Sequence, residues 1–327
     1  MMSPALSLDT GTYAPHELHG LQRVWPETNC YVDLWIELLH SLQMDPRAML
    51  AFTVAMDFEG DQWTFFKPSL SDIYALYGID VQELAIWRPL PLHIAEQVSL
   101  GRTVLVEVDA FFLPDTQGVS YGIHHTKTTV AINAIDLISR RLGYFHNAGL
   151  FELSGTDFDG LFAGCSDAAT HGVTLAPYTE IAKLDRLVRR TETELRNMAS
   201  ELLSQHLQRS PRTNPVARYR KRFLKDVAWL SEQDMAVFHQ YAFATLRQCG
   251  ACAELASSFL GWMDAQPGEK SAAAEHFGII AASAKALQFK LARAVSTKKP
   301  TDFETALNTM EDSWGGAMSD LTARYSG

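Results

Sequence analysis

Cys30 is the residue of this sequence best placed to do covalent chemistry. Val32, Trp35 and Leu39 recur at helical spacing after it, so we expect a helix that begins at about Cys30. Free backbone N–H groups and the helix dipole at such a position favour the nucleophilic thiolate and can stabilise an oxyanion. The competing interpretation is a small buried hydrophobic residue, as free cysteines commonly are.

A histidine pair offers the base that a cysteine nucleophile needs. His124 and His125 stand where a loop enters an expected strand, and either imidazole could act as general base and then as general acid. Asn147 follows the next strand and could orient that imidazole, with Asp136 as the competing orienting group. Each residue alone is also ordinary strand-end or turn chemistry.

Other polar residues form a second tier of candidates for the same site. Asn29 or Gln22, together with the Cys30 N–H, could supply an oxyanion hole. Asp109 ends an expected strand in the part of the fold that would face the site.

The elements that must position these side chains change character along the chain. The expected elements of the first half are a helix over 30–43, a hairpin from strands 49–58 and 62–66, helices over 71–77 and 90–100, and strands over 103–109, 125–135 and 142–145. After Cys165 the strand signal fades, and helices are expected over 179–208, 216–230, 233–265, 271–295 and 302–325. We therefore expect an α+β domain with an antiparallel sheet over 1–170 and an all-helical domain over 171–327.

The order cysteine at a helix start, histidine at a strand start, then asparagine or aspartate after the next strand resembles papain-like folds. The local papain signature around Cys30 is absent, and the closer likeness is to bacteriocin-leader peptidases and butirosin-type acyltransferases. The butirosin-type enzymes move an acyl group from a carrier-protein thioester to an amine. This resemblance implies Cys30 as nucleophile, His125 as acid–base group and Asn147 as orienting group.

A second resemblance covers nearly the whole chain. The sequence is identified as a member of an uncharacterised bacterial domain family, often encoded near carrier proteins and amino acid:carrier-protein ligases. The segments that carry this resemblance are Asp57–Lys67, Glu107–Thr116, His125–Thr129 and Leu142–Asn147. The family pattern has one histidine before Lys-Thr-Thr, which favours His125 over His124.

Together these resemblances predict a cysteine-dependent acyl or aminoacyl transferase. Its donor would be a carrier-protein thioester, which brings a 4′-phosphopantetheine arm, and its acceptor a small amine; no cofactor of its own is expected. A peptidase, amidase or thioesterase on the same triad, or a non-catalytic binding protein of this fold, are the alternatives.

A basic cluster stands out in an otherwise acidic protein. The formal net charge is −10, which argues against general nucleic-acid binding. Arg218, Arg220, Lys221 and Arg222 could nevertheless dock an acidic carrier protein, although a solvated helix face is an equal alternative.

The remaining cysteines and the apolar segments bear on metal binding and on the location of the protein in the cell. Cys249 and Cys252 form one CxxC inside a helical pattern, without a second pair, so we expect helix packing and no metal. No secretory signal and no apolar run long enough for a membrane span is visible, and a cytoplasmic protein is expected.

Overall fold

A computed structural model describes residues 3–26, 29–163, 176–264 and 271–325. The chain divides into two compact units that interleave along the sequence. The sheet unit contains Met1–Gly20, Cys30–Pro46 and Leu70–Arg189, and the helical unit contains Leu21–Asn29, Arg47–Ser69 and Arg190–Gly327. Each unit is therefore built from three separate stretches of chain.

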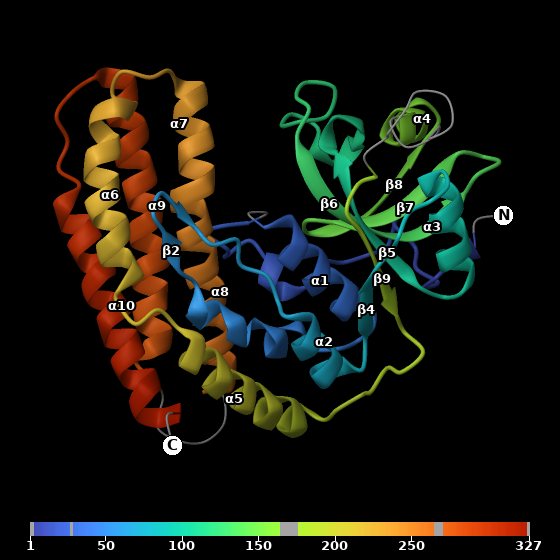
Figure 1. The fold of residues 1–327 in the computed structure, drawn as a ribbon, viewed down its shortest axis with the longest axis horizontal. Coiled ribbons are helices and arrows are strands. Elements are labelled where there is room, and N and C mark those ends of the chain that lie inside the picture. The colour runs from blue at the N-terminus through green and yellow to red at the C-terminus, as the bar shows by residue number, and fades with distance from the viewer. Residues whose placement is uncertain (1–2, 27–28, 164–175, 265–270, 326–327) are drawn as a thin grey trace. The chain divides into compact units, whose positions relative to one another are not determined.

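The sheet unit is organised around one antiparallel sheet with the strand order β4-β9-β5-β6-β7-β8 (Figure 1). Its strands are β4 (Asp80–Glu83), β9 (Thr179–Lys183), β5 (Thr103–Asp109), β6 (Lys127–Asp136), β7 (Arg141–His146) and β8 (Gly149–Ser154), and the short β1 (Ser3–Pro4) pairs with β6. The fold is thus α+β with an antiparallel sheet region, followed by a helical region.

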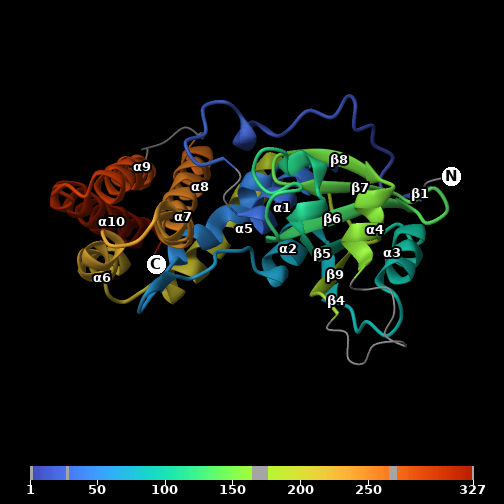
Figure 2. The same cartoon turned by 90° about the horizontal axis from the view of Figure 1, so that it is seen from above.

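The two faces of this sheet bury different helices. Val106 and Ile132, with their neighbours of the same face, pack against α3 (Leu90–Ser99) and α4 (Thr156–Phe162). Because side chains alternate along a strand, Leu105, Ala131 and Phe145 point to the other face. There α1 (Cys30–Ser41) lies across β6 and β7, on the side of the sheet away from α3 (Figure 2). The remaining helix of the unit, α2 (Leu70–Tyr77), contacts β4.

One row of paired residues shows how α1 is placed on the sheet. Glu180, Leu105, Ala131, Phe145 and Leu150 stand opposite one another on five consecutive strands. At the start of α1, the Tyr31 hydroxyl donates to Glu180 at 2.7 Å. Two turns later, Glu37 accepts from Tyr13, whose ring packs edge-on against Phe145. The helix therefore runs across the strands and begins at the β9 side.

The helical unit is a bundle whose core includes segments from the first 70 residues. Its helices are α5 (Glu192–Arg209), α6 (Pro215–Leu230), α7 (Met235–Ala242), α8 (Gln248–Met263), α9 (Ala273–Thr297) and α10 (Glu304–Tyr325), with a π-helical turn over Phe243–Arg247. The start of α5 is fixed by a capping box between Thr191 and Glu194. A 3-10 helix over Pro46–Ala55 and a hairpin of β2 (Phe58–Glu59) and β3 (Gln62–Trp63) supply the earlier segments.

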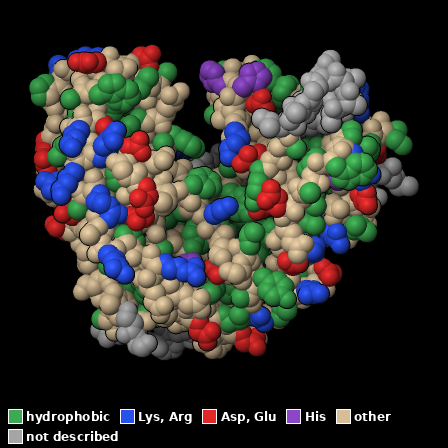
Figure 3. Space-filling model, in the orientation of Figure 1, with side chains coloured by type: hydrophobic (Ala, Val, Ile, Leu, Met, Phe, Trp, Pro, Cys, Tyr) green, Lys and Arg blue, Asp and Glu red, His purple; other side chains and the backbone are tan. Residues whose placement is uncertain are grey.

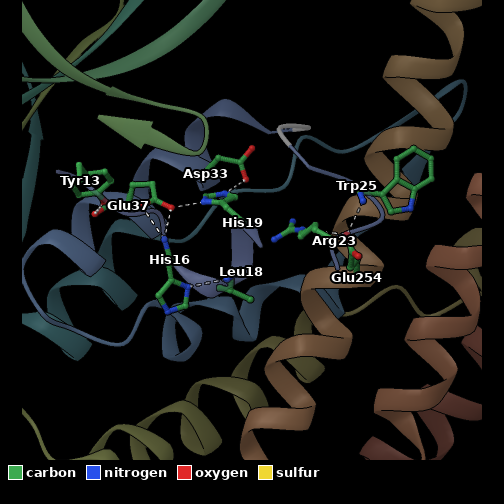
Figure 4. Close-up of polar contacts among 9 residues, drawn as sticks. All are labelled: Tyr13, His16, Leu18, His19, Arg23, Trp25, Asp33, Glu37 and Glu254. Carbon is green, nitrogen blue, oxygen red and sulfur yellow. Dashed lines mark hydrogen bonds and ion pairs between the residues drawn. The ribbon is translucent and has the colours of Figure 1, made fainter. Parts of the chain in front are cut away.

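Trp25 anchors the first of these segments to the bundle. Its indole is fully buried, donates to the Ala281 carbonyl at 3.0 Å and lies directly against Gly250. Glu254 of α8 accepts from the backbone N–H groups of Val24 and Trp25, as Figure 4 shows for Trp25. A side chain from the irregular lead-in of the sequence thus belongs to the core of the C-terminal bundle.

Two sequence-based expectations about elements were wrong. The stretch 49–58 was expected as a strand, but most of it lies in the 3-10 helix Pro46–Ala55. The helix expected over 179–208 is a strand, β9, followed by a turn and α5. Both errors have one cause: consecutive residues are buried in each segment, apolar ones in Pro46–Ala55 and Thr179–Ala182 in β9, so neither segment shows a helical or strand period.

Candidate functional site

Cys30 occupies the first position of α1 and is partly exposed. Cys249 and Cys252, in contrast, are fully buried in α8, and burial raises the pKa of both thiols. Cys165 lies outside the described residues. Of the three described thiols, Cys30 alone combines exposure with the first position of a helix, where the helix dipole favours a thiolate.

A buried charge cluster lies on the same stripe of α1 as Cys30. Asp33 and Glu37 follow at i+3 and i+7, so they lie one and two turns along one side of the helix. The imidazole of His19 is held between them: Nε2 lies 3.2 Å from Asp33 Oδ1, and Nδ1 makes a short contact with Glu37 Oε1 (Figure 4). All three side chains are at most 1% exposed.

The two carboxylates keep His19 positively charged. Burial opposes the charge, but the hydrogen bonds and negative charges of Asp33 and Glu37 outweigh it and raise the pKa of His19 to about 9. An imidazolium therefore lies beside the helix start that presents Cys30.

Glu37 also fastens the N-terminal segment to α1. Its carboxylate accepts from the Tyr13 hydroxyl at 2.6 Å and from the His16 backbone N–H at 3.1 Å (Figure 4). Burial, followed by the bond to Glu37, raises the pKa of Tyr13. Sequence reasoning missed this cluster because His19 stands in an irregular lead-in. The available signal was a pair of carboxylates, Asp33 and Glu37, inside an apolar helix.

His125 is held by Asp109, the second-tier candidate, at the ends of β5 and β6. Its Nδ1 lies 2.5 Å from Asp109 Oδ2, and its ring stacks on Phe111 with centroids 4.3 Å apart. The same carboxylate accepts from the N–H groups of Phe111 and Thr126. Burial opposes ionisation, but the hydrogen bond with His125, followed by these two N–H groups, holds the pKa of Asp109 below its usual value. The imidazole side chain is 70% exposed, so Nε2 is open to solvent.

Cys30 and His125 are not joined by a hydrogen bond in the described residues. Asp109 points to the α1 face of the sheet, but it lies four residues beyond Leu105 on β5, which is about 13 Å along a strand. Leu105 is the partner of Glu180, which the start of α1 contacts. The convergence of Cys30 with His125 therefore stays a prediction.

The two proposed orienting groups both lie in turns. Asn147 has φ +46° in the two-residue connection between β7 and β8, and in the described residues it makes no hydrogen bond to His125. Asp136 ends β6 at the opposite end from His125, about 30 Å away for a strand of this length. It accepts from the N–H groups of Ile138 and Ser139, and these bonds, the one from Ser139 first, hold its pKa at about 2. The structure thus corrects the expectation that Asp136 competes as orienting group.

The other second-tier candidates have ordinary surroundings. Asn29 is buried and donates to the Phe66 carbonyl at 2.6 Å within the helical unit. Gln22 is exposed in the same unit, and the side chain of His124 is exposed in the sheet unit.

A second buried network, which sequence reasoning also missed, lies on the α3 face. Asp115 accepts from the Tyr144 hydroxyl at 2.6 Å and lies 2.6 Å from His146 Nδ1. The other ring nitrogen of His146 lies 2.8 Å from Thr128 Oγ1. These residues belong to three of the family-like segments, but no segment alone indicates that they meet.

The expected docking cluster on α6 is largely neutralised within the helical unit. Arg218 pairs with Asp57, Arg220 with Glu304 and Glu311, and Arg222 with Asp226. Lys221 is exposed and makes no ion pair among the described residues. Basic and acidic side chains are interspersed over the face of the bundle drawn in Figure 3.

Two features are absent from the part of the chain that the structure describes. No group of three or more histidine, cysteine, aspartate or glutamate side chains is arranged to hold a metal ion. No described helix has an apolar stretch long enough to cross a membrane.

The fold is that of an α+β protein whose helical bundle also contains segments from the first 70 residues. The chain belongs to the DUF1839 family: the family's N-terminal domain matches residues 14–184, and its C-terminal domain matches residues 192–323. No curated protein matches the sequence.

Proposed function

We propose that this protein is a cysteine-dependent acyl or aminoacyl transferase. The Cys30 thiolate attacks the carbonyl carbon of a carrier-protein thioester, and the carrier thiol leaves with a proton. An amine then attacks the new thioester, and Cys30 is released as the amide forms. His125 moves the protons, and Asp109 holds its ring.

The position of Cys30 carries this proposal. It is a partly exposed thiol at the first position of a helix, where the helix dipole favours a thiolate. The donor and acceptor classes are supported by sequence resemblance alone.

His125 has the organisation expected of an acid–base group. Asp109 fixes Nδ1, which leaves Nε2 to exchange protons with a bound substrate or with Cys30. The proposed chemistry requires that this ring and the Cys30 sulfur meet in the reactive complex.

Intact-mass analysis with a defined thioester tests the first step. An acyl-N-acetylcysteamine thioester should add one acyl group to the protein, and peptide mapping should place it on Cys30. Cys30→Ala should abolish the adduct, whereas Cys249→Ala, a matched change at a buried thiol, should leave it unchanged. An unmodified protein at high thioester concentration would contradict the proposal and favour a binding protein.

The fate of the adduct separates a transferase from a hydrolase. With a panel of small amines, a transferase should release amide faster than free acid, because an acceptor amine outcompetes water. Release of acid alone at an unchanged rate would assign the site to a thioesterase or amidase instead.

Disulfide trapping tests whether Cys30 and position 125 come together. In His125→Cys, a disulfide with Cys30 requires Cα atoms within about 7 Å, so mild oxidation should produce it if the two side chains share a site. Asp136→Cys is the matched control at the far end of β6 and should give none. Equal trapping at positions 125 and 136, or none at either, would remove His125 from the proposed mechanism.

A further inference from the structure

The segment that carries His125 is a long connection fixed at both ends. Residues 110–126 join β5 to β6, and the Ala110 N–H donates to the Thr126 carbonyl at 2.8 Å where the connection closes. Within it, the Thr116 carbonyl accepts from three backbone N–H groups and the Thr116 hydroxyl contacts the carbonyls of Ala110 and Leu113. The connection is therefore internally ordered, but these bonds alone do not fix it on the sheet.

Asp115 is the polar side chain that ties this connection to the sheet core. Its side chain is only 3% exposed, although the residue belongs to a surface connection. Both carboxylate oxygens are used by β7: Oδ1 by the Tyr144 hydroxyl and Oδ2 by His146 Nδ1, each at 2.6 Å. A buried carboxylate with two such partners strongly resists leaving its place.

His146 connects Asp115 to β6 as well. Its ring is buried and lies between Asp115 and the Thr128 hydroxyl, three residues beyond His125. The connection leaves β5 at Asp109 and re-enters the sheet next to Thr128. Asp109 and His125 therefore both lie close to the places where the connection is attached to the sheet.

We infer that Asp115 and His146 are positioning residues that hold the 110–126 connection, and with it His125, in one arrangement. This inference rests on the proposed acid–base role of His125, which needs a fixed ring. The second polar anchor of the connection, from Tyr121 to Asp157 of α4 at 3.0 Å, is half-exposed and is the weaker of the two polar restraints.

NMR of the histidine rings tests the inference without any assay of activity. At a pH where exposed imidazoles are neutral, His125 should carry its proton on Nδ1, facing Asp109. In Asp115→Asn, which keeps the side-chain shape, His125 should show a mixture of both tautomers, as free histidine does. Amide exchange over 110–126 should rise about tenfold or more, because the connection opens locally. Asp136→Asn, the same change in the turn at the far end of β6, should alter neither.

Each outcome decides the question. A folded Asp115→Asn protein with an unchanged His125 tautomer and unchanged exchange would overturn the inference. If that variant does not fold, Tyr144→Phe, which removes only one bond to Asp115, should still raise exchange over 110–126, and no rise would overturn it. Failure to form an acyl-enzyme with these spectra as expected would reject the proposed function and leave the positioning role intact.

Discussion

The two buried carboxylates along α1, Asp33 and Glu37, both contact the ring of His19. The imidazolium is buried between two buried carboxylates, and removing it would take away a positive charge that both of them contact. Breaking such a cluster is costly, because an unpaired buried charge has lost its water without a replacement. The stability of the sheet unit should therefore depend on the charge of this one histidine.

The direction of the pH dependence follows from the raised pKa of His19. With an unfolded pKa of about 6.5 and a folded pKa of about 9, charged His19 contributes fully below about pH 6.5 and loses its contribution as pH rises through 9. Urea unfolding of wild type and His19→Gln should differ by on the order of 2–3 kcal/mol at low pH, and this difference should shrink at high pH. A difference that grows between about pH 6 and 9.5 would contradict a charged His19.

The orienting role can be assigned by comparing Asp109, a second-tier candidate, with Asn147, the orienting group of the sequence-based triad. Asp109→Asn should reduce acyl transfer about a hundredfold, because an amide no longer holds the charged ring. Asn147→Gly should preserve both transfer and stability, since glycine readily adopts the positive φ that Asn147 has. Large loss of transfer in a folded Asn147→Gly protein would restore Asn147 to the mechanism.

Among the elements, those with a clear period were predictable and those buried on all sides were not. The strand expected over 103–109 is β5 with the same bounds, because its β-branched residues stand between clear turn signals. β9 was missed because Thr179, Glu180 and Ile181 are all buried between two strands and show no alternation. Cys30 at a helix start and the pairing of β6 with β7 were predictable; the partner of His125 was not, since Asp109 is adjacent only once β5 pairs with β6.

The ion pairs of α6 reduce the proposed docking residues from four to one. Its arginines are paired with acids of the same unit, so Lys221 is the one of the four proposed cations that makes no ion pair among the described residues. If an acidic carrier docks here, Lys221→Glu should weaken its binding about fivefold at low salt, with the effect screened at high salt. Lys299→Glu is the matched change elsewhere on the bundle. Equal effects of the two variants would mean general charge attraction and no docking site on α6.

At the scale of the whole molecule, the helical unit depends on chain segments that precede the sheet. Phe58 and Trp63 of the β2–β3 hairpin pack on Tyr219 of α6, with ring centroids 5.3 and 5.4 Å apart. Trp25 fills the space above Gly250 of α8. A fragment of residues 190–327 lacks Trp25, Phe58 and Trp63. It should therefore be helical by circular dichroism but should lack a cooperative unfolding transition. A cooperative transition like that of the full chain would show that the bundle is independent.

A single substitution in the intact chain tests whether the helical unit depends on the segment around Trp25. Trp25→Ala removes a fully buried indole and its bond to the Ala281 carbonyl, so it should destabilise the helical unit by about 3–5 kcal/mol. Trp87→Ala is the matched control, because that indole is 77% exposed in the sheet unit, and it should cost about 0.5 kcal/mol or less. Hydrogen exchange read by mass spectrometry assigns the loss: peptides of α8 and α9 should lose protection in Trp25→Ala, whereas peptides of β5 and β6 should keep theirs. If α8 and α9 keep their protection in Trp25→Ala, the segment around Trp25 only lies against a bundle that is stable without it.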